Sequence, residues 1–168
     1  MKRPFLILLA AICACAQAPK QPPTPVQSIT SNFNYVNKQL LDMANDFPAD
    51  KYNYRPKPEM RSFGEVLLHV MAGNIYAART GRGENVKWDD QEVDPKKYPG
   101  KAEIVAAFQK SVDDATAVLK GIPPEHFTQT ISPWLAVIEH SAEHYGLLVA
   151  YYRLNGVVPP ASRPQPKK

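Results

Sequence analysis

Apolar residues recur at helical spacing in four separate segments, and this recurrence restricts the fold more than any other feature. The first segment covers about 26–46 and ends before Pro48. Its apolar stripe consists of Ile29, Phe33, Val36, Leu40, Met43 and Phe47. Spacings of three and four place such residues on one face of an α-helix. Similar patterns cover about 63–80, 101–120 and 133–154, and we find no strand pattern or internal repeat. The sequence therefore predicts an all-α protein, built as a four-helix bundle.

Capping signals fix several of the predicted helix ends. Ser62 has the character of an N-cap, and Glu65 stands three residues later, as in a capping box. Ser132 followed by Pro133 is typical of a helix start, so we expect the fourth helix to begin there. The pair Asn155-Gly156 is typical of a helix end.

The connection between the second and third predicted helices is unusually long. Residues 81–100 are mostly polar, and connections in helical bundles usually have about two to eight residues. Such a length predicts either a crossover along the bundle or a lid over a site. Trp88, within this connection, is a candidate to cover a pocket.

The N-terminal residues 1–18 have the pattern of a secretory signal peptide. Lys2 and Arg3 precede an apolar stretch from Phe5 to Ala14, and Ala16-Gln-Ala18 resembles a cleavage site. Cleavage before Cys15 is the alternative, and it would leave a lipid anchor on that cysteine. We expect an exported protein, periplasmic or secreted. A Pro-rich tether (19–25), the bundle (26–160) and a basic Pro-rich tail (161–168) would follow.

Charge and cysteine content exclude several classes of protein. The chain has 20 Lys and Arg against 16 Asp and Glu, and two of the basic residues lie in the expected signal. The remainder is close to neutral, which argues against nucleic-acid binding. Both cysteines, Cys13 and Cys15, also lie in the signal. The mature domain is therefore expected to lack disulfides, thiol nucleophiles and Cys-ligated zinc.

Three of the four histidines are candidates for one metal site. His140 and His144 are spaced i, i+4, which places both rings on one face of a helix. His69 lies in the second predicted helix and can complete the set from a packed neighbour. Three neutral imidazoles leave a metal ion with open positions, as in catalytic sites. The alternative is that each histidine is a core residue with one hydrogen bond.

The inward face of the fourth helix contains both of its candidate ligands and several apolar residues. This face consists of Val137, His140, Ser141, His144, Leu148 and Tyr151. Gly73 leaves room beside the His69 ring. Glu65 most simply caps its helix, but it is also a weak candidate for a catalytic base or for orienting a ligand. His126 is expected to be a surface residue in a loop. No phosphate-binding glycine loop, hydrolase elbow or Glu-x-x-His pair is present.

The chain resembles the DinB-like superfamily, also called YfiT-like, which includes metal-dependent enzymes. The resemblance covers about 26–160. It is based on Arg61-Ser-Phe-Gly-Glu-Val-Leu-Leu-His69, Glu139-His-Ser-Ala-Glu-His-Tyr-Gly146 and Tyr152-Arg-Leu-Asn-Gly-Val-Val-Pro-Pro160. It implies a bundle whose helix order departs from simple up-and-down. It also implies a divalent metal at His69, His140 and His144, with zinc or nickel expected before iron or manganese. Many relatives have Gln where this chain has Leu147.

Three functions are consistent with these features. The first is a metal-dependent enzyme acting on a small molecule, either hydrolytic or, as in some members of the superfamily, a thiol transferase. The second is a non-catalytic stress module of the cell envelope that binds a metal or small ligand. The third is a structural bundle with relic histidines. Membrane association is expected only if Cys15 is lipidated. The sequence does not distinguish a monomer from a homodimer.

Overall fold

The computed structural model describes residues 21–164, and within this range it consists of helices and connections without a β-strand. The four long helices are α1 (Pro25–Asp46), α2 (Phe63–Gly81), α3 (Lys101–Gly121) and α4 (Pro124–Leu154). Four short 3-10 helices lie between or after them: η1 (Ala49–Lys51), η2 (Asp89–Gln91), η3 (Pro95–Lys97) and η4 (Pro160–Ser162). The expected signal peptide, including Cys15, lies outside the described residues. The all-α prediction is confirmed.

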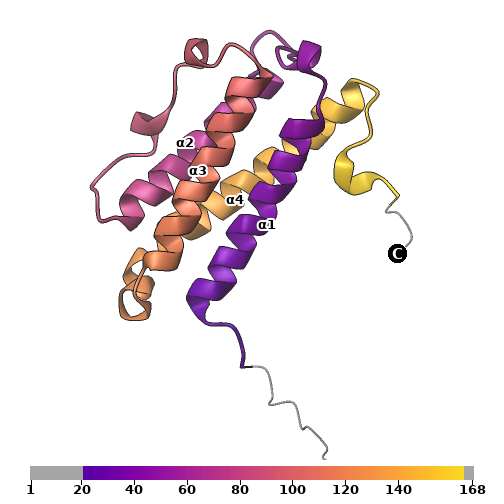
Figure 1. Cartoon of the computed structure of the whole chain (residues 1–168). Coiled ribbons are helices and arrows are strands. Elements are labelled where there is room, and N and C mark those ends of the chain that lie inside the picture. The colour runs from indigo at the N-terminus through magenta and orange to yellow at the C-terminus, as the bar shows by residue number, and fades with distance from the viewer. Residues whose placement is uncertain (1–20, 165–168) are drawn as a thin grey trace, which may run out of the picture.

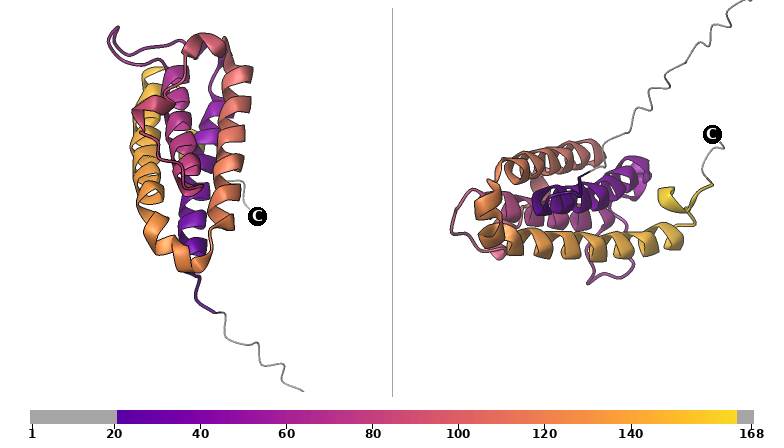
Figure 2. Two further views of the ribbon diagram at one scale, coloured as in Figure 1. Left: turned by 90° about the vertical axis from the view of Figure 1, so that its left-hand side faces the viewer. Right: turned by 90° about the horizontal axis from the view of Figure 1, so that it is seen from below.

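The four helices form a bundle in which α1 and α4 run in one direction and α2 and α3 run in the other (Figure 1). Each of α2 and α1 packs against both α3 and α4. The neighbours α2 and α3 are therefore parallel, which a short turn between them cannot achieve. The connection from 82 to 100 returns along α2 to the opposite end of the bundle (Figure 2). The predicted crossover is thus present, and its length is a consequence of the helix order.

The first turn of α2 has the predicted capping box. The backbone N–H of Glu65 donates to Ser62 Oγ at 3.3 Å, and the backbone N–H of Ser62 donates to Glu65 Oε2 at 2.9 Å. A second box, which the sequence reading did not identify, joins Thr24 and Gln27 at the start of α1. Both boxes satisfy N–H groups that have no partner inside the helix.

The predicted start of the fourth helix is wrong. α4 begins at Pro124, and Pro133 lies inside the helix instead of at its first position. Pro124 occupies the first turn, where a missing N–H costs nothing. Phe127 lies before the expected start and Trp134 after it, and both side chains are buried. Their packing therefore maintains the helix through Pro133. His126 is consequently in the first turn of α4, although it is exposed as expected.

Aromatic side chains pack closely at the end of the bundle where α2 begins. Phe47 stacks on Phe63 with ring centroids 3.9 Å apart, and Tyr52 and Tyr152 pack against the same pair. The hydroxyl of Tyr152 donates to the Met43 carbonyl at 2.7 Å. These contacts fix the start of α2, and therefore its first turns, relative to α1 and α4.

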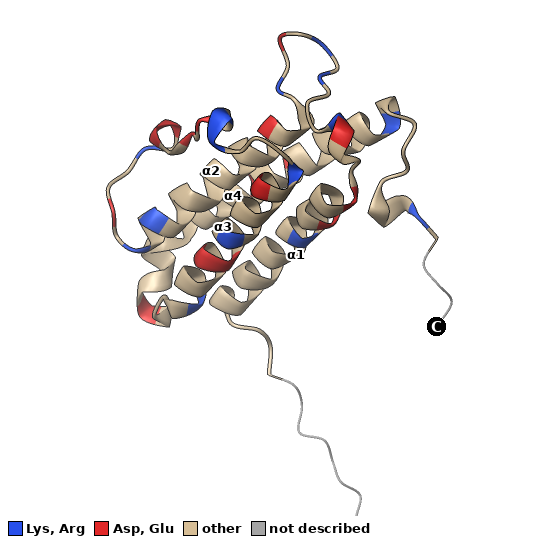
Figure 3. Ribbon diagram, turned by 45° about the horizontal axis from the view of Figure 1, so that its top comes forward, with Lys and Arg blue, Asp and Glu red and all other residues tan. Residues whose placement is uncertain are grey.

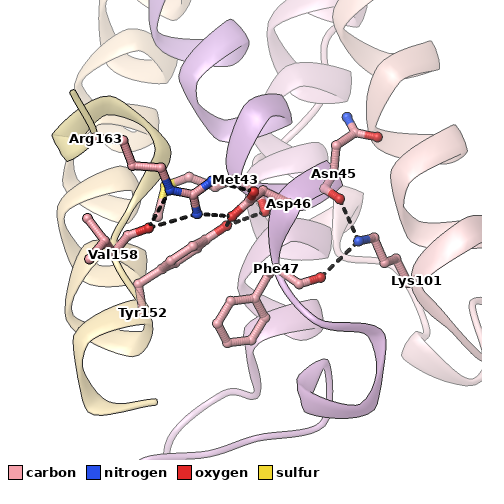
Figure 4. Close-up of polar contacts among 8 residues, drawn as sticks. All are labelled: Met43, Asn45, Asp46, Phe47, Lys101, Tyr152, Val158 and Arg163. Carbon is pink, nitrogen blue, oxygen red and sulfur yellow. Dashed lines mark hydrogen bonds and ion pairs between the residues drawn. The ribbon is translucent and has the colours of Figure 1, made fainter. Parts of the chain in front are cut away.

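Two basic side chains bind the C-terminal end of α1 and connect it to the start of α3 and to the segment after α4 (Figure 4). Lys101 Nζ donates to the carbonyls of Asn45 and Phe47, the latter at 2.8 Å, at the C-terminal end of α1. A cation there also interacts favourably with the helix dipole. Arg163 Nη1 donates to Asp46 Oδ1 at 2.7 Å and joins the segment after α4 to α1.

Basic and acidic residues alternate along the helices and connections rather than gathering on one face in the view of Figure 3. Within residues 21–164, no helix is both long enough and apolar enough to cross a membrane.

Candidate metal centre

The three predicted histidines come together between α2 and α4. His69 projects from α2, and His140 and His144 project from α4, which packs against α2 in the opposite direction. One ring nitrogen from each lies within 4.8 Å of the other two. Nε2 of His140 is 3.0 Å from Nε2 of His69. The i, i+4 spacing brings the His140 and His144 ring centroids to 4.2 Å.

Two of the imidazoles are oriented through their Nδ1 atoms. Nδ1 of His69 contacts the Glu92 carboxylate, which comes from the connection after α2. Nδ1 of His144 donates to the carbonyl of His140, one turn earlier, at 2.9 Å. Nδ1 is occupied in both rings, so Nε2 is the atom available for a ligand. Partners of this kind commonly fix the tautomer and orientation of metal-binding histidines.

His140 is the most constrained of the three. Its Nδ1 is buried and has no hydrogen-bond partner among the described residues. Burial lowers the pKa of His140 to about 3, and the nearby His144 and His69 rings act in the same direction. Burial also lowers the pKa of His144. Both rings are therefore neutral at physiological pH, and the neutral imidazole is the form that binds a metal ion.

The residues present fit a divalent metal ion. Two nitrogens bound to one tetrahedral Zn²⁺ at about 2.0–2.1 Å would be separated by roughly 3.3–3.4 Å. The Nε2 atoms of His69 and His140 are 3.0 Å apart, so a small movement would accommodate the ion. The Nδ1 contacts of His69 and His144 leave their Nε2 atoms available, and neutral imidazole nitrogens are donors that such an ion prefers. His69, His140 and His144 are the residues that would hold it.

The long connection supplies two residues that contact the cluster. Trp88 packs edge-on against His140, with ring centroids 4.8 Å apart, and its other neighbour is Tyr76. The ring also occupies the space that Gly73 leaves, because a Cβ on Gly73 would lie 2.7 Å from Trp88 Cζ2. Trp88 thus covers His140, but it is not among the residues that line the pocket beside His144, so its predicted role as a pocket cover stays a prediction.

Glu92 is the contact that sequence reasoning missed. The helix patterns gave no reason to single out one acid among several in a polar connection. Glu65, which they did single out, is occupied otherwise: its carboxylate accepts from Arg55 and from the Ser62 backbone. The Arg55 and Ser62 bonds hold the pKa of Glu65 below its usual value despite partial burial. These are the contacts of a capping residue.

A pocket opens beside His144 at the start of α2. Its volume is about 460 Å³. Its lining consists of Glu59, Met60, Arg61, Val66, His144, Leu147 and Tyr151. Leu147 contributes an apolar wall. Among the three histidines, His144 lines this pocket, so it is the member of the cluster that a small molecule in the pocket would meet.

The fold and the site together define a helical bundle with a three-histidine cluster suited to a metal ion. A model of the DinB superfamily matches residues 32–151, which is more than two thirds of the chain. The protein belongs to the DinB superfamily. A search of curated protein sequences found no match.

Proposed function

We propose that this protein is an exported metal-dependent enzyme that binds one divalent ion through His69, His140 and His144. The observation that carries the proposal is the convergence of three ring nitrogens within 4.8 Å, with one of the three histidines, His144, in the lining of an open pocket. A site that only stored a metal, or only stabilised the bundle, would need no pocket beside a ligand. The pocket therefore supports a protein that meets a small molecule over one that only holds a metal ion. Turnover distinguishes the proposed enzyme from the alternative, a non-catalytic module that binds a small ligand.

A divalent ion at this site would supply a Lewis acid, able to activate water for hydrolysis or the sulfur of a small thiol. The protein contributes the remaining features. Glu92 orients the His69 ring, the His140 carbonyl orients His144, and Trp88 excludes water from one side of His140. The pocket beside His144 positions the substrate. We favour hydrolysis over thiol transfer, because pools of small thiols are mainly cytoplasmic and the protein is expected to be exported.

Metal content is the first test. The protein would be purified without a polyhistidine tag and measured by elemental mass spectrometry, before and after loading with zinc, nickel, iron and manganese. We expect about one ion per chain, lost in the double variant His140→Ala/His144→Ala. His126→Ala is the matched control, because His126 is exposed on the same helix outside the cluster. Absence of metal from the loaded wild-type protein would refute the proposal.

Turnover separates the enzyme from the binding module. The metal-loaded protein would be tested on a panel of small esters, amides and thiol conjugates. An activity lost in His140→Ala and kept in His126→Ala is the expected result. Equal activity in both variants would exclude a mechanism at this site, and stoichiometric metal without turnover would favour the binding module.

Export rests on residues 1–18 and is likewise a proposal. Intact-mass measurement of the protein recovered from cells distinguishes the two possible products of signal cleavage. Cleavage after Ala18 gives an unmodified chain, whereas cleavage before Cys15 gives a chain with a diacylglycerol group and membrane attachment.

A further inference from the structure

The pocket beside His144 has one charged side that the metal ligands do not explain. Arg61 and the acidic Glu59 line it together with three apolar residues, Met60, Val66 and Leu147. Its volume of about 460 Å³ lies in the range of sites for small molecules, about 300–1,000 Å³. A pocket of this kind combines a cation with an apolar wall.

The backbone of Arg61 is fixed by a hydrogen bond, whereas the N–H groups of its guanidinium have no hydrogen-bond acceptor among the described residues. The carbonyl of Arg61 accepts a 2.6 Å hydrogen bond from the Tyr151 hydroxyl of α4. The side chain is about half exposed and makes no hydrogen bond with another described residue. Its ion pair with Glu92 spans 3.8 Å, which is too long for a hydrogen bond. By contrast, the neighbouring Arg55 donates to Glu65 and to the Met60 carbonyl.

Arg61 and His144 line the same pocket. An anion that entered the pocket would meet the guanidinium of Arg61, which is a cation at any physiological pH. A guanidinium presents a fork of N–H donors that matches a carboxylate in two parallel hydrogen bonds.

We propose that this pocket binds the substrate of the metal site through a carboxylate held by Arg61, with a short apolar chain against Met60, Val66 and Leu147. This substrate class rests on the proposed function. Binding of the carboxylate itself does not, because Arg61 is not a metal ligand. Glu59 lines the same pocket without pairing with Arg61 among the described residues, so its charge opposes an anion there.

The test uses the metal-free protein, so that the probe cannot bind to a metal ion. Calorimetry or NMR titration would compare hexanoate with hexanamide, which has the same chain and a neutral head. We expect hexanoate to bind more tightly. Arg61→Gln should lower the affinity for hexanoate by about tenfold or more, as expected for loss of a hydrogen bond to a charged group. The affinity for hexanamide should stay nearly unchanged.

Two further variants act as controls. Glu59→Gln should strengthen hexanoate binding, because it removes the opposing charge, while Arg153→Gln should leave it unchanged, because Arg153 is exposed on α4 outside the pocket lining. Thermal unfolding of each variant checks that the fold is kept. Unchanged hexanoate binding in Arg61→Gln, equal binding of hexanamide, or no measurable binding of hexanoate to the wild-type protein would each overturn the inference.

Metal binding by the same variants separates this inference from the proposed function. Arg61→Gln should retain the metal ion. Metal binding without Arg61-dependent hexanoate binding refutes the carboxylate site alone. Arg61-dependent hexanoate binding in a protein that takes up no metal refutes the metal-dependent function and leaves the anion site standing.

Discussion

Glu92 contacts Nδ1 of His69 from a connection that returns along the outside of α2. A carboxylate at Nδ1 keeps the ring proton on that atom and leaves the lone pair of Nε2 directed toward Nε2 of His140, 3.0 Å away. The long connection therefore does more than allow α2 and α3 to run parallel. It also orients one of the three candidate ligands.

Replacing Glu92 should weaken metal binding without removing a ligand. We expect Glu92→Gln to lower metal affinity by about 10–100-fold, the usual effect of losing a carboxylate partner of a ligating histidine. Competition with a chelator of known affinity measures it, and NMR of the imidazole nitrogens reports the tautomer of His69. Asp90→Asn is the control, because Asp90 is an exposed acid of the same connection. Equal affinity in wild type and Glu92→Gln would mean that the contact does not orient the ligand.

A methyl group at Gly73 should displace Trp88 from His140. The added Cβ would lie 2.7 Å from Trp88 Cζ2 and 3.0 Å from Cη2, so the indole must move. Gly146 lies within α4 and would meet nothing within 4 Å. Gly146→Ala should therefore stabilise the protein by about 0.5–1 kcal/mol. Gly73→Ala should show no such stabilisation, because the clash with Trp88 offsets it.

Tryptophan fluorescence monitors the displacement. Trp134 is fully buried and should emit equally in both variants, so a red shift confined to Gly73→Ala reports Trp88. Identical spectra and equal stabilisation in the two variants would contradict the packing of Trp88 against Gly73.

The sequence predicted the elements whose signals are local. The apolar spacing, the Ser62–Glu65 capping box and the i, i+4 pair of His140 and His144 each depend on neighbours within one helix, and each is present. The convergence of His69 with that pair required packing of α2 on α4. It could be expected only because all three histidines occupied or bordered inward faces.

Contacts between distant segments could not be predicted in the same way. Asn74 of α2 donates to Asn37 Oδ1 of α1 at 3.1 Å and to Ser111 Oγ of α3 at 3.3 Å. Nothing near these residues in the sequence indicates that they are partners. Glu92 was missed for the same reason. The start of α4 was misjudged because a local signal, Ser132-Pro133, was outweighed by burial of Phe127 and Trp134.

The ion pair between Asp46 and Arg163 should make stability depend on pH in the acid range. The hydrogen bond from Arg163 holds the pKa of Asp46 below its ordinary value of 3.8. A carboxyl group with a lowered native pKa stabilises the fold above its unfolded pKa and loses this contribution as pH falls through the native value. Arg163→Gln should therefore be less stable than wild type at neutral pH, and the difference should vanish in strong acid.

Urea unfolding of both proteins across this pH range measures the difference, with Arg153→Gln as a control for the loss of one positive charge. A difference that stays constant down to the lowest pH would show that Arg163 stabilises the protein through packing rather than through Asp46.

Pro133 offers a direct check on the corrected start of α4. Inside a helix, proline removes one backbone hydrogen bond and its ring crowds the preceding turn. Pro133→Ala should therefore raise the free energy of unfolding by about 1–2 kcal/mol, since the relieved cost of about 3 kcal/mol is partly offset by greater freedom of the unfolded chain. Pro124→Ala should bring no such gain, because Pro124 lies in the first turn of α4, where proline is well tolerated. If the helix instead began at Ser132, Pro133 would be at its first position, and Pro133→Ala would be neutral or destabilising. Chemical denaturation of the two variants beside wild type distinguishes these helix starts.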